Sequence, residues 1–380
     1  MNCGENGIGM KVLFLAAASS VHTVKWVNAL VSRNIEILLV YNKGHEPTSE
    51  DIDSKVKKYC LKYSGSLGYY MNAHELRRVF KEFKPDLVNA HYASGYGTLA
   101  RKAGVAPVLL SVWGSDVYDF PYEGKIKNSI LKKNVRYASA LASTSNCMAN
   151  QLRKVMNDES LQIYVTPFGV DVQKFSSENF LRKKDSREIV ICNIKMLKPK
   201  YGIREIILAV DKLIKDQEFI QKCDKKIKLK IFGDGEQKDE LQNMVKKKKL
   251  EDTVYFCGKI PNAQVPEELS KADIFCAFSQ LDSESFGVAV VEAMAMQVPV
   301  VVSDVDGFKE VVSNRETGFI VDRHDILACK NALKKLVLDE HLRTQMGQAG
   351  RRRVKIFFDW EKNVDKMESI YYKLSGKNQD

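Results

Sequence analysis

The chain has 380 residues, of which 44% are hydrophobic and 28% charged, and its formal net charge is +11. This length is too great for one ordinary hydrophobic core and predicts two or three domains, while the composition excludes a disordered chain. The basic excess is spread over both halves and favours anionic partners such as nucleotides, phosphorylated substrates or an acidic membrane surface; nucleic acid is disfavoured, because the sequence has neither zinc-finger spacing nor an aromatic RNA-binding motif.

The first apolar stretch, MKVLFLAAASS at residues 10–20, allows two interpretations. A lysine, a short apolar run and small residues are typical of a secretory signal peptide. The alternative is a buried strand at 11–16, followed by a helix at 22–33 and a second strand at 35–41. We favour the strand, because the same alternation continues along the chain and cleavage would remove its first member. The apolar runs are shorter than the ~20 residues that a membrane-spanning helix needs.

Short apolar runs alternate with helical patterns through the rest of the chain. In the first half we expect strands at 87–90, 108–112, 140–143 and 163–166, and helices at 72–83, 96–103, 125–137 and 147–155. A polar stretch at 176–188 has no apolar periodicity and is the best candidate for a linker. Beyond it we expect strands at 189–194, 227–232, 254–256, 274–277 and 298–302, and helices at 203–215, 237–248, 266–271, 287–296, 326–338, 340–355 and 359–374.

This alternation predicts an α/β protein with parallel sheets covered by helices on both faces. Two such sheets joined by one linker would form a cleft between them, where ligands of α/β proteins usually bind. Eight cysteines occur without a C-x-x-C pair, and Cys192, Cys257 and Cys276 lie in or beside apolar runs. We expect buried free thiols in a reducing, cytoplasmic compartment. Six scattered histidines without H-E-x-x-H predict no metal site.

Two glutamates, Glu284 and Glu292, interrupt the otherwise apolar run SESFGVAVVEAMAMQVPVVVSD at 283–304. Glutamate is seldom buried without a partner, so each carboxylate needs a partner or a task. Gly287 allows a ligand to approach the backbone closely, and the free N–H groups of the helix that starts there favour a phosphate. The helical part of the spacing separates the carboxylates by about 10 Å, roughly the reach from the sugar of a nucleotide-sugar to its ribose.

Two interpretations of this pair remain open. Glu284 could lie near the sugar, the helix N-terminus could hold the diphosphate, and Glu292 could accept the ribose hydroxyls. Alternatively, Glu292 is a structural carboxylate paired with the backbone and Glu284 caps the helix. Spacing alone does not decide between them.

The segment SESFGVAVVEAMAMQVPVV resembles the E-x7-E segment, and its continuation, of the retaining glycosyltransferases of family 4. NIKMLKPKYGI is similar to the family's R-L-x-x-x-K-G segment, with Lys195 at the arginine position and Lys200 at the lysine position. KIFGDGEQKDEL, VYFCGKIP and VTPFGVD resemble its GDG strand-loop, its V-F-G strand and its PNGVD inter-domain segment. The ordered set covers essentially all of residues 10–375.

The resemblance implies a GT-B fold, in which two Rossmann-like doubly wound domains face each other across a cleft. It places an acceptor-side domain at 1–180, a donor-binding domain at 181–358, and a final helix at 359–380 that crosses back onto the first domain. The implied reaction is a retaining, metal-independent hexosyl transfer without a cofactor. A UDP- or GDP-sugar would be the donor and a glycan or lipid-linked molecule the acceptor, in bacterial cell-surface polysaccharide or glycoconjugate synthesis.

Departure of the sugar leaves a diphosphate with new negative charge, so preorganised cations and backbone N–H groups are expected around it. The resemblance assigns this catalysis to Glu284, Lys195 and Lys200. Lysine is a point charge where the family's arginine is bidentate, and the alternative for both lysines is a solvated basic loop. The expected donor-binding residues are Glu292, Ser285, Phe286, Gly287, Val288, Gly233, Lys259 and Ile260.

The N-terminal half departs further from the family. AAASSVHT, with Ser19 and Ser20, stands where the family often has a glycine-rich loop, and Trp113 replaces the histidine that usually contacts the donor sugar. Trp113 could stack on a sugar or pack the cleft wall, and His91 could supply the missing imidazole or be structural. Asp116 could bind acceptor hydroxyls or cap a helix. These residues form the predicted acceptor and sugar side.

The stretch at 122–137, which contains the helix expected at 125–137, is basic and amphipathic. Its cations are Lys125, Lys127, Lys132, Lys133 and Arg136, and its apolar residues are Ile126, Ile130, Leu131 and Val135. Such a helix can lie on an anionic membrane, here the inner face of the cell membrane, or it can simply present a solvated charged face.

Three other functions compete with glycosyl transfer. A sugar-nucleotide epimerase would bind similar donors, but the E-x7-E set argues against it. A non-catalytic nucleotide-sugar-binding subunit is suggested only by Trp113 and Lys195. A nicotinamide dehydrogenase is disfavoured, because GDGEQK lacks the third glycine of the dinucleotide fingerprint.

Overall fold

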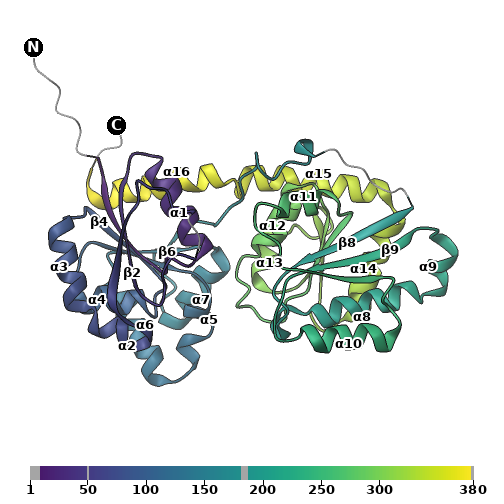
Figure 1. Cartoon of the computed structure of the whole chain (residues 1–380), viewed down its shortest axis with the longest axis horizontal. Helices are drawn as coiled ribbons and strands as arrows, with labels where there is room; N and C mark the ends of the chain where they lie inside the picture. Colours follow the sequence, from purple (N-terminus) through teal and green to yellow (C-terminus); the bar gives the residue numbers. More distant parts are fainter. Residues whose placement is uncertain (1–8, 49–50, 181–186, 378–380) are drawn as a thin grey trace, which may run out of the picture. The chain divides into compact units, whose positions relative to one another are not determined.

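The computed structural model describes residues 9–48, 51–180 and 187–377. The chain divides into two compact units, the first containing residues up to 168 and from 361 onward, and the second containing residues 169–360. Figure 1 shows that each unit is built around its own sheet. The predicted linker at 176–188 falls in the second unit, and its residues 181–186 lie outside the described residues.

The sheet of the first unit is parallel and, in the described residues, has the strand order β3-β2-β1-β4-β5-β6-β7. Its strands are β1 (Lys11–Leu15), β2 (Glu36–Lys43), β3 (Lys57–Ser64), β4 (Leu87–His91), β5 (Val108–Val112), β6 (Ala140–Ser143) and β7 (Tyr164–Val165). β1 lies at the centre, and Val12, Leu13, Phe14 and Leu15 are fully buried. The prediction that this run forms a core strand is therefore confirmed.

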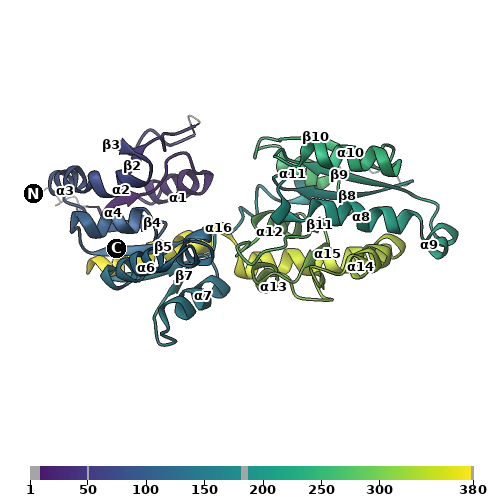
Figure 2. The ribbon, with the colours of Figure 1, turned by 90° about the horizontal axis from the view of Figure 1, so that it is seen from below.

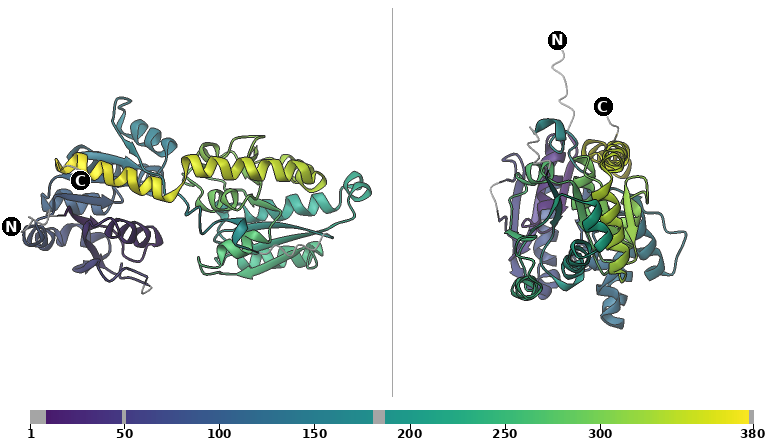
Figure 3. Two further views of the ribbon diagram at one scale, coloured as in Figure 1. Left: turned by 90° about the horizontal axis from the view of Figure 1, so that it is seen from above. Right: turned by 90° about the vertical axis from the view of Figure 1, so that its right-hand side faces the viewer.

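The helices of the first unit cover both faces of this sheet. They are α1 (Val21–Val31), α2 (Gly65–Met71), α3 (Ala73–Phe83), α4 (Tyr96–Ala103), α5 (Ser115–Tyr118), α6 (Lys125–Tyr137), α7 (Asn146–Met156) and α16 (Trp360–Ser375), with a 3-10 turn at Phe120–Tyr122. The strand order reverses between β1 and β4, so right-handed crossovers place α1 on the face opposite α4. Figure 3 shows the ribbon of the whole chain from two further sides.

The last helix, α16, is attached to the first unit by charge and by hydrogen bonds. Arg33, just after α1, forms ion pairs with Asp365, Glu361 and Glu368, the last two at 2.8 and 3.2 Å. The hydrogen bond that Arg33 donates to Asp365 is the largest of the contributions that raise the pKa of Arg33. On the inner side of the helix, the buried Tyr371 hydroxyl accepts a 2.5 Å hydrogen bond from the side-chain amide of Asn89 in β4.

The second unit has a parallel sheet whose order in the described residues is β10-β9-β8-β11-β12-β13. Its strands are β8 (Glu188–Ile194), β9 (Lys226–Phe232), β10 (Val254–Gly258), β11 (Ile274–Ala277), β12 (Val300–Ser303) and β13 (Gly318–Val321). Its helices are α8 (Ile203–Ile214), α9 (Gln217–Lys222), α10 (Lys238–Lys248), α11 (Val265–Ser270), α12 (Val288–Ala295), α13 (Asp306–Val311), α14 (Ile326–Leu338) and α15 (Glu340–Phe357), with 3-10 turns at Ser177–Asn179 and Pro199–Tyr201. Because the order reverses between β8 and β11, α8 and α12 cover opposite faces (Figures 1 and 2).

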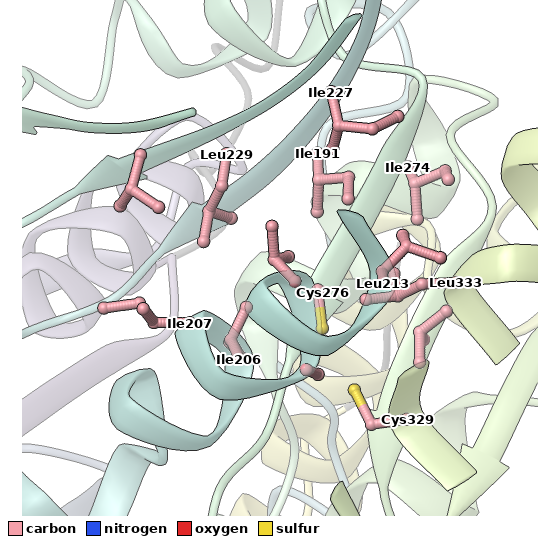
Figure 4. Packing of buried hydrophobic residues seen from close by; sticks show 14 of the residues in the cluster. Ile191, Ile206, Ile207, Leu213, Ile227, Leu229, Ile274, Cys276, Cys329 and Leu333 are labelled. Carbon is pink, nitrogen blue, oxygen red and sulfur yellow. The ribbon is translucent and has the colours of Figure 1, made fainter. Parts of the chain in front are cut away.

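One layer of the second unit's core lies between the sheet and helices α8 and α14 (Figure 4). Ile191, Leu229 and Cys276 reach it from strands, and Cys329 reaches it from α14. Hydrogen bonding with Cys329, together with burial, raises the pKa of the Cys276 thiol. Cys192 and Cys276 are buried free thiols as predicted. The prediction for Cys257 is wrong, because β10 is an edge strand and Cys257 faces solvent.

The elements that the sequence did not reveal are short or lie at sheet edges. Strand β3, at one edge of the first sheet, has lysine at three of its eight positions and one buried residue, and β13, at an edge of the second, has four residues. Helices α2, α5, α9 and α13 have seven residues or fewer, too short to show an apolar period. The other elements begin and end within a few residues of their predicted limits.

Candidate functional site

The carboxyl edge of the second unit's sheet is the first candidate site. Its strands run parallel, so the loops that follow them meet at one edge. Lys195 directly follows β8, and the loop that contains Glu284 follows β11, the neighbouring strand. The strand order reverses between these two strands, and such a reversal is where open α/β sheets bind ligands.

Close backbone packing fixes the loop of Lys195. Gly233, after β9, has φ +148°, and a Cβ there would lie 1.9 Å from the Lys195 carbonyl oxygen. The Lys195 N–H donates to the Phe232 carbonyl at 2.9 Å, and the Gly233 N–H donates to the Gly258 carbonyl at 2.8 Å. Gly233 therefore acts through the room it gives to Lys195, since any side chain would displace that loop.

The predicted catalytic residues of this unit lie together. The Lys195 ammonium is 2.5 Å from the Glu284 carboxylate, and the two side chains are 28% and 11% exposed. The ammonium groups of Lys195 and Lys200 lie 4.5 and 5.1 Å from the ring centroid of Tyr201. Sequence reasoning missed Tyr201, although its position next to Lys200 in a loop was a usable signal.

The start of helix α12 borders this cluster. Gly287, with φ +79°, is the N-cap residue, and Val288 begins the helix. Ser285 and Phe286 precede it and are buried. The Phe286 ring packs edge-to-face on Phe358 at 5.6 Å, so its side chain belongs to the core.

Within α12 the partly exposed residues form one stripe. Val288, Ala289 and Glu292 are partly exposed, while Val290, Val291 and the residues from Ala293 to Ala295 are buried. Because residues three and four apart lie on one helix face, Glu292 shares its face with the first turn. Glu292 is therefore half-buried, on the same side of the helix as Val288 and Ala289 in its first turn.

A small cavity lies beneath this edge. Asn193, Lys195, Tyr201, Gly287 and Ala289 are among its lining residues. The side-chain amide of Asn193 donates to the Cys276 carbonyl at 2.7 Å, whereas its Oδ1 is buried without a hydrogen-bond partner among the described residues. Asn193 was not predicted, because a single Asn at the end of an apolar strand carries no distinctive pattern.

Arg323, another residue that the sequence did not single out, ties the neighbouring loops together. It follows β13 and donates to Asp282 at 3.0 Å and to Asp304 at 2.9 Å. Burial, the largest single influence, would raise the pKa of both carboxyl groups, but the hydrogen bonds and charge of Arg323, together with backbone N–H donors, outweigh it and lower the pKa of both. The loop of Glu284 is thereby held to the loop after β12.

Lys259 and Ile260 lie at the same edge but farther out. They follow β10, which is separated from β8 by β9. Lys259 is exposed and Ile260 is partly exposed. The structure does not place them in the lysine–glutamate cluster.

The first unit has a corresponding edge, which is more deeply buried. Asp116 is fully buried and accepts hydrogen bonds from the N–H groups of Ala93, Trp113 and Gly114 at 2.8, 3.1 and 2.9 Å. Burial raises the pKa of its carboxyl, and these hydrogen bonds oppose the shift. Neither predicted role for Asp116, hydroxyl binding or helix capping, fits this geometry; the residue joins the loops after β4 and β5.

His91 and Trp113 belong to an aromatic cluster at this edge. His91 is 1% exposed, stacks on Phe14 at 4.3 Å and meets the edge of Trp113 at 4.7 Å. Burial lowers the pKa of His91 to about 3, so the ring is neutral. Neither ring nitrogen has a hydrogen-bond partner in the part of the chain that the structure describes. This burial favours the structural alternative for His91 over contact with a sugar.

The rest of the edge is half-exposed. Trp113 also packs edge-on against Phe168 at 5.6 Å and near His22, which stacks on Phe168 at 3.9 Å. Ser20 is the N-cap residue of α1 without a side-chain cap hydrogen bond, and the Ser19 N–H donates to the His45 carbonyl at 3.2 Å. The predicted Ser19, Ser20 and Trp113 therefore lie at one edge.

Two features are absent from the described residues. No group of three or more His, Cys, Asp or Glu side chains is arranged to hold a metal ion. None of the described helices combines the length and the apolar character required to span a bilayer.

Sequence comparisons match both halves of the chain. Residues 176–353 match the family described as glycosyl transferases group 1, and residues 11–145 match glycosyl transferase 4-like. The N-acetyl-alpha-D-glucosaminyl L-malate synthase of Bacillus anthracis is 26% identical over 317 residues, covering 79% of this chain and 78% of the relative. A GDP-mannose-dependent monoacylated phosphatidylinositol monomannoside mannosyltransferase of Corynebacterium glutamicum is 26% identical over 316 residues, covering 78% and 79%.

Solved structures share the fold over nearly the whole chain. Anabaena HepE in complex with UDP superposes with a TM-score of 0.79 at 16% identity, covering 96% of this chain and 100% of that one. The sucrose-phosphate synthase of Thermosynechococcus elongatus gives 0.80 at 17% identity, covering 97% and 99%.

Proposed function

The chain belongs to the glycosyltransferases of the group 1 and 4-like families and has the GT-B fold, and we propose that it transfers a hexosyl group from a nucleotide-diphosphate sugar to a glycan or lipid-linked acceptor. The proposal includes retention of the anomeric configuration and independence of a metal ion. The observation that carries it is the cluster of Lys195, Lys200 and Glu284 beside the first turn of α12.

This cluster supplies what departure of a nucleoside diphosphate requires. When the bond between the sugar and the phosphate oxygen breaks, its electron pair stays on the diphosphate. Lys195, Lys200 and the N–H groups that open α12 would stabilise that charge where it develops. The Glu292 carboxylate, on the exposed stripe of the same helix, would accept the ribose hydroxyls, and Glu284 would lie near the sugar.

The relatives support the substrate class. The mannosyltransferase of C. glutamicum is named as GDP-mannose-dependent, and Anabaena HepE was solved with UDP. The first relative is named for an L-malate product and the second for a phosphatidylinositol mannoside. We place the present enzyme in cytoplasmic glycoconjugate synthesis for cell-surface polymers, with the donor base, sugar and acceptor to be assigned by experiment.

Contact with the inner face of the cell membrane is part of the proposal. In α6, Lys125, Lys133 and Arg136 are exposed, and so is Ile126 at 78%. Leu131 and Val135, which the amphipathic pattern also offered, are buried in the first unit's core and take no part. Sedimentation with anionic vesicles, but not with neutral vesicles, tests this contact.

The function itself is tested with a panel of UDP- and GDP-sugars. Slow release of free nucleotide identifies the donor, and proton NMR of the transferred sugar reports the anomeric configuration. Lys200→Ala serves as the matched variant that should lose the signal. Epimerised nucleotide-sugar instead of free nucleotide, or no reaction with any donor, would contradict glycosyl transfer.

A further inference from the structure

The ring of Tyr201 faces both cations of the proposed donor site. Its centroid lies 4.5 Å from the Lys195 ammonium and 5.1 Å from the Lys200 ammonium, and Lys195 also pairs with Glu284. We propose that Tyr201 is a positioning residue whose ring face holds these two ammonium groups ready for the departing diphosphate. The inference deepens the proposed glycosyl transfer and rests on it for its kinetic consequences.

Backbone contacts hold the turn that carries Tyr201 in place. Tyr201 ends the turn Pro199–Tyr201, where proline fixes one backbone angle. The next residue, Gly202, has φ +63°, and a Cβ there would lie 1.9 Å from the Phe278 carbonyl oxygen. The Gln280 N–H donates to the Lys200 carbonyl at 2.8 Å. The turn is therefore fastened to the loop after β11, the loop that brings Glu284.

Apolar packing also anchors Tyr201. Tyr201 packs against the buried cluster of the second unit and lines the small cavity beneath the edge. Tyr201 thus has apolar neighbours as well as the two lysines. A flexible residue in this position would leave the two long lysine chains free to swing into solvent.

Electrostatics explains why a ring is suitable here. The two ammonium groups that meet this ring repel each other, and the Glu284 carboxylate pairs with that of Lys195. The face of an aromatic ring carries negative potential and attracts cations within about 6 Å of its centroid. The ring adds attraction without adding a full negative charge, so two lysines and one glutamate keep a positive surplus for an anion. A second carboxylate in place of the ring would cancel that surplus.

The first experiment compares Tyr201→Phe with Tyr201→Leu on the best donor found. Phenylalanine keeps the ring face, so we expect turnover within about twofold of wild type. Leucine keeps apolar volume but removes the ring, and we expect turnover to fall about tenfold, the scale of one cation–ring contact in a desolvated site, with a smaller change in KM. Equal turnover of the two variants would overturn the proposal.

A matched control lies in the same unit. The Lys228 ammonium lies 5.8 Å from the ring centroid of Tyr255, in edge strand β10 and outside the lysine–glutamate cluster. Tyr255→Leu makes the same chemical change without touching the proposed site, so its turnover should equal that of wild type. Thermal melting of all variants separates a loss of packing at Tyr201 from a loss of cation positioning.

Ring fluorination tests the electrostatic cause directly. Replacing Tyr201 by mono-, di- and trifluorinated phenylalanine weakens the negative ring face stepwise while its shape is nearly kept. We expect turnover to fall with each added fluorine. A role in packing alone would leave turnover level across the series, and that result would overturn the proposal even if Tyr201→Leu is impaired.

Binding of inorganic pyrophosphate provides a readout that needs no donor. Calorimetry should show weaker binding by Tyr201→Leu than by Tyr201→Phe, with Lys200→Ala as the weakened reference. If wild type turns over no donor but this order of affinities holds, the proposed function fails and the ring's role stands. Absence of pyrophosphate binding by wild type, or equal affinities, would overturn the ring's role.

Discussion

The two units place different chemistry at the same edge of the same kind of sheet. In the second unit the edge carries partly exposed charges, with Lys195 and Glu284 in contact beside the first turn of α12. In the first unit the edge carries a fully buried Asp116, engaged by three backbone N–H groups, and a buried neutral His91 between aromatic rings. The topology sets where a site can form, and solvent access sets what its ionisable groups can do.

This difference predicts two kinds of mutational effect. Charges near solvent in the second unit can meet a ligand, so changing them should alter binding and turnover while the fold persists. Polar groups buried in the first unit are tied to structure, so changing them should alter stability.

The largest effect is expected from Lys200→Ala. If Lys200 stabilises the departing diphosphate, its removal should lower turnover about a hundredfold or more, and more than it weakens donor binding. Steady-state kinetics on the best donor provide the measurement. Lys198→Ala, which removes an exposed lysine from the same loop, is the control and should retain full turnover. Near-normal turnover in both Lys200→Ala and Lys195→Ala would mean that the leaving group is held elsewhere.

The second-largest effect is expected from Glu292→Gln, which should weaken binding of the donor. A carboxylate accepts two ribose hydroxyls better than an amide does, and losing a charge-assisted hydrogen bond costs roughly 1.5–3 kcal/mol. We expect nucleotide-sugar affinity, measured by calorimetry, to fall by about ten- to a hundredfold. Glu251→Gln, at an exposed position after α10, should bind as wild type does. Unchanged affinity in folded Glu292→Gln would remove the ribose assignment.

On the buried side of the comparison, His91 should make the first unit sensitive to acid. The pKa of His91 is about 3 in the folded chain and 6.5 as its ordinary value. Between these values the unfolded state binds more protons, so the free energy of unfolding falls as pH falls from 6.5 toward 3, and roughly 2 kcal/mol is lost by pH 5.

The test compares urea unfolding of wild type and His91→Phe at pH 7 and pH 5. Phenylalanine cannot take up a proton and keeps an aromatic ring against Phe14, so this variant should lose less stability on acidification. His74→Phe, which changes an exposed histidine on α3, should behave like wild type. Equal losses in wild type and His91→Phe would show that His91 does not couple folding to pH.

A smaller effect is expected from Lys195→Arg. The substitution keeps the positive charge and restores the residue typical of the family, and its planar group can still reach Glu284 or a phosphate oxygen. Turnover should change by only a few-fold, far less than in Lys195→Ala. If Lys195→Arg lowered turnover as much as Lys195→Ala, the shape of the side chain at this position would matter more for turnover than its charge.

No change at all is expected on chelation. If Lys195, Lys200 and the start of α12 do the work of a metal against the diphosphate, turnover in excess EDTA should equal that in buffer. Full loss on chelation, with recovery on adding magnesium or manganese, would refute metal independence and would move the electrostatic role away from the lysines.

The sequence by itself determined the alternation of strands and helices, the doubly wound class and the segments that form the second unit's edge. Apolar runs such as Lys11–Leu15 and Ile274–Ala277 were visible because strands buried on both faces must be continuously apolar. The sequence could not reveal β3, because an edge strand with mostly exposed residues has the same polar composition as a loop. The loops of Lys195 and Glu284 were found because their residues resemble a family, not because spacing placed them together.

Only the tertiary structure decided what each polar residue contacts. Asp116 and Glu284 look alike in sequence, each beside a serine near the start of a helix, yet one is buried against backbone N–H groups and the other pairs with Lys195. Arg323 gained its partners from loops that are far away in the chain and adjacent only at the sheet edge. The physical reason is that periodicity encodes which face of an element is buried, whereas the environment of an ionisable group depends on neighbours that only strand order brings together.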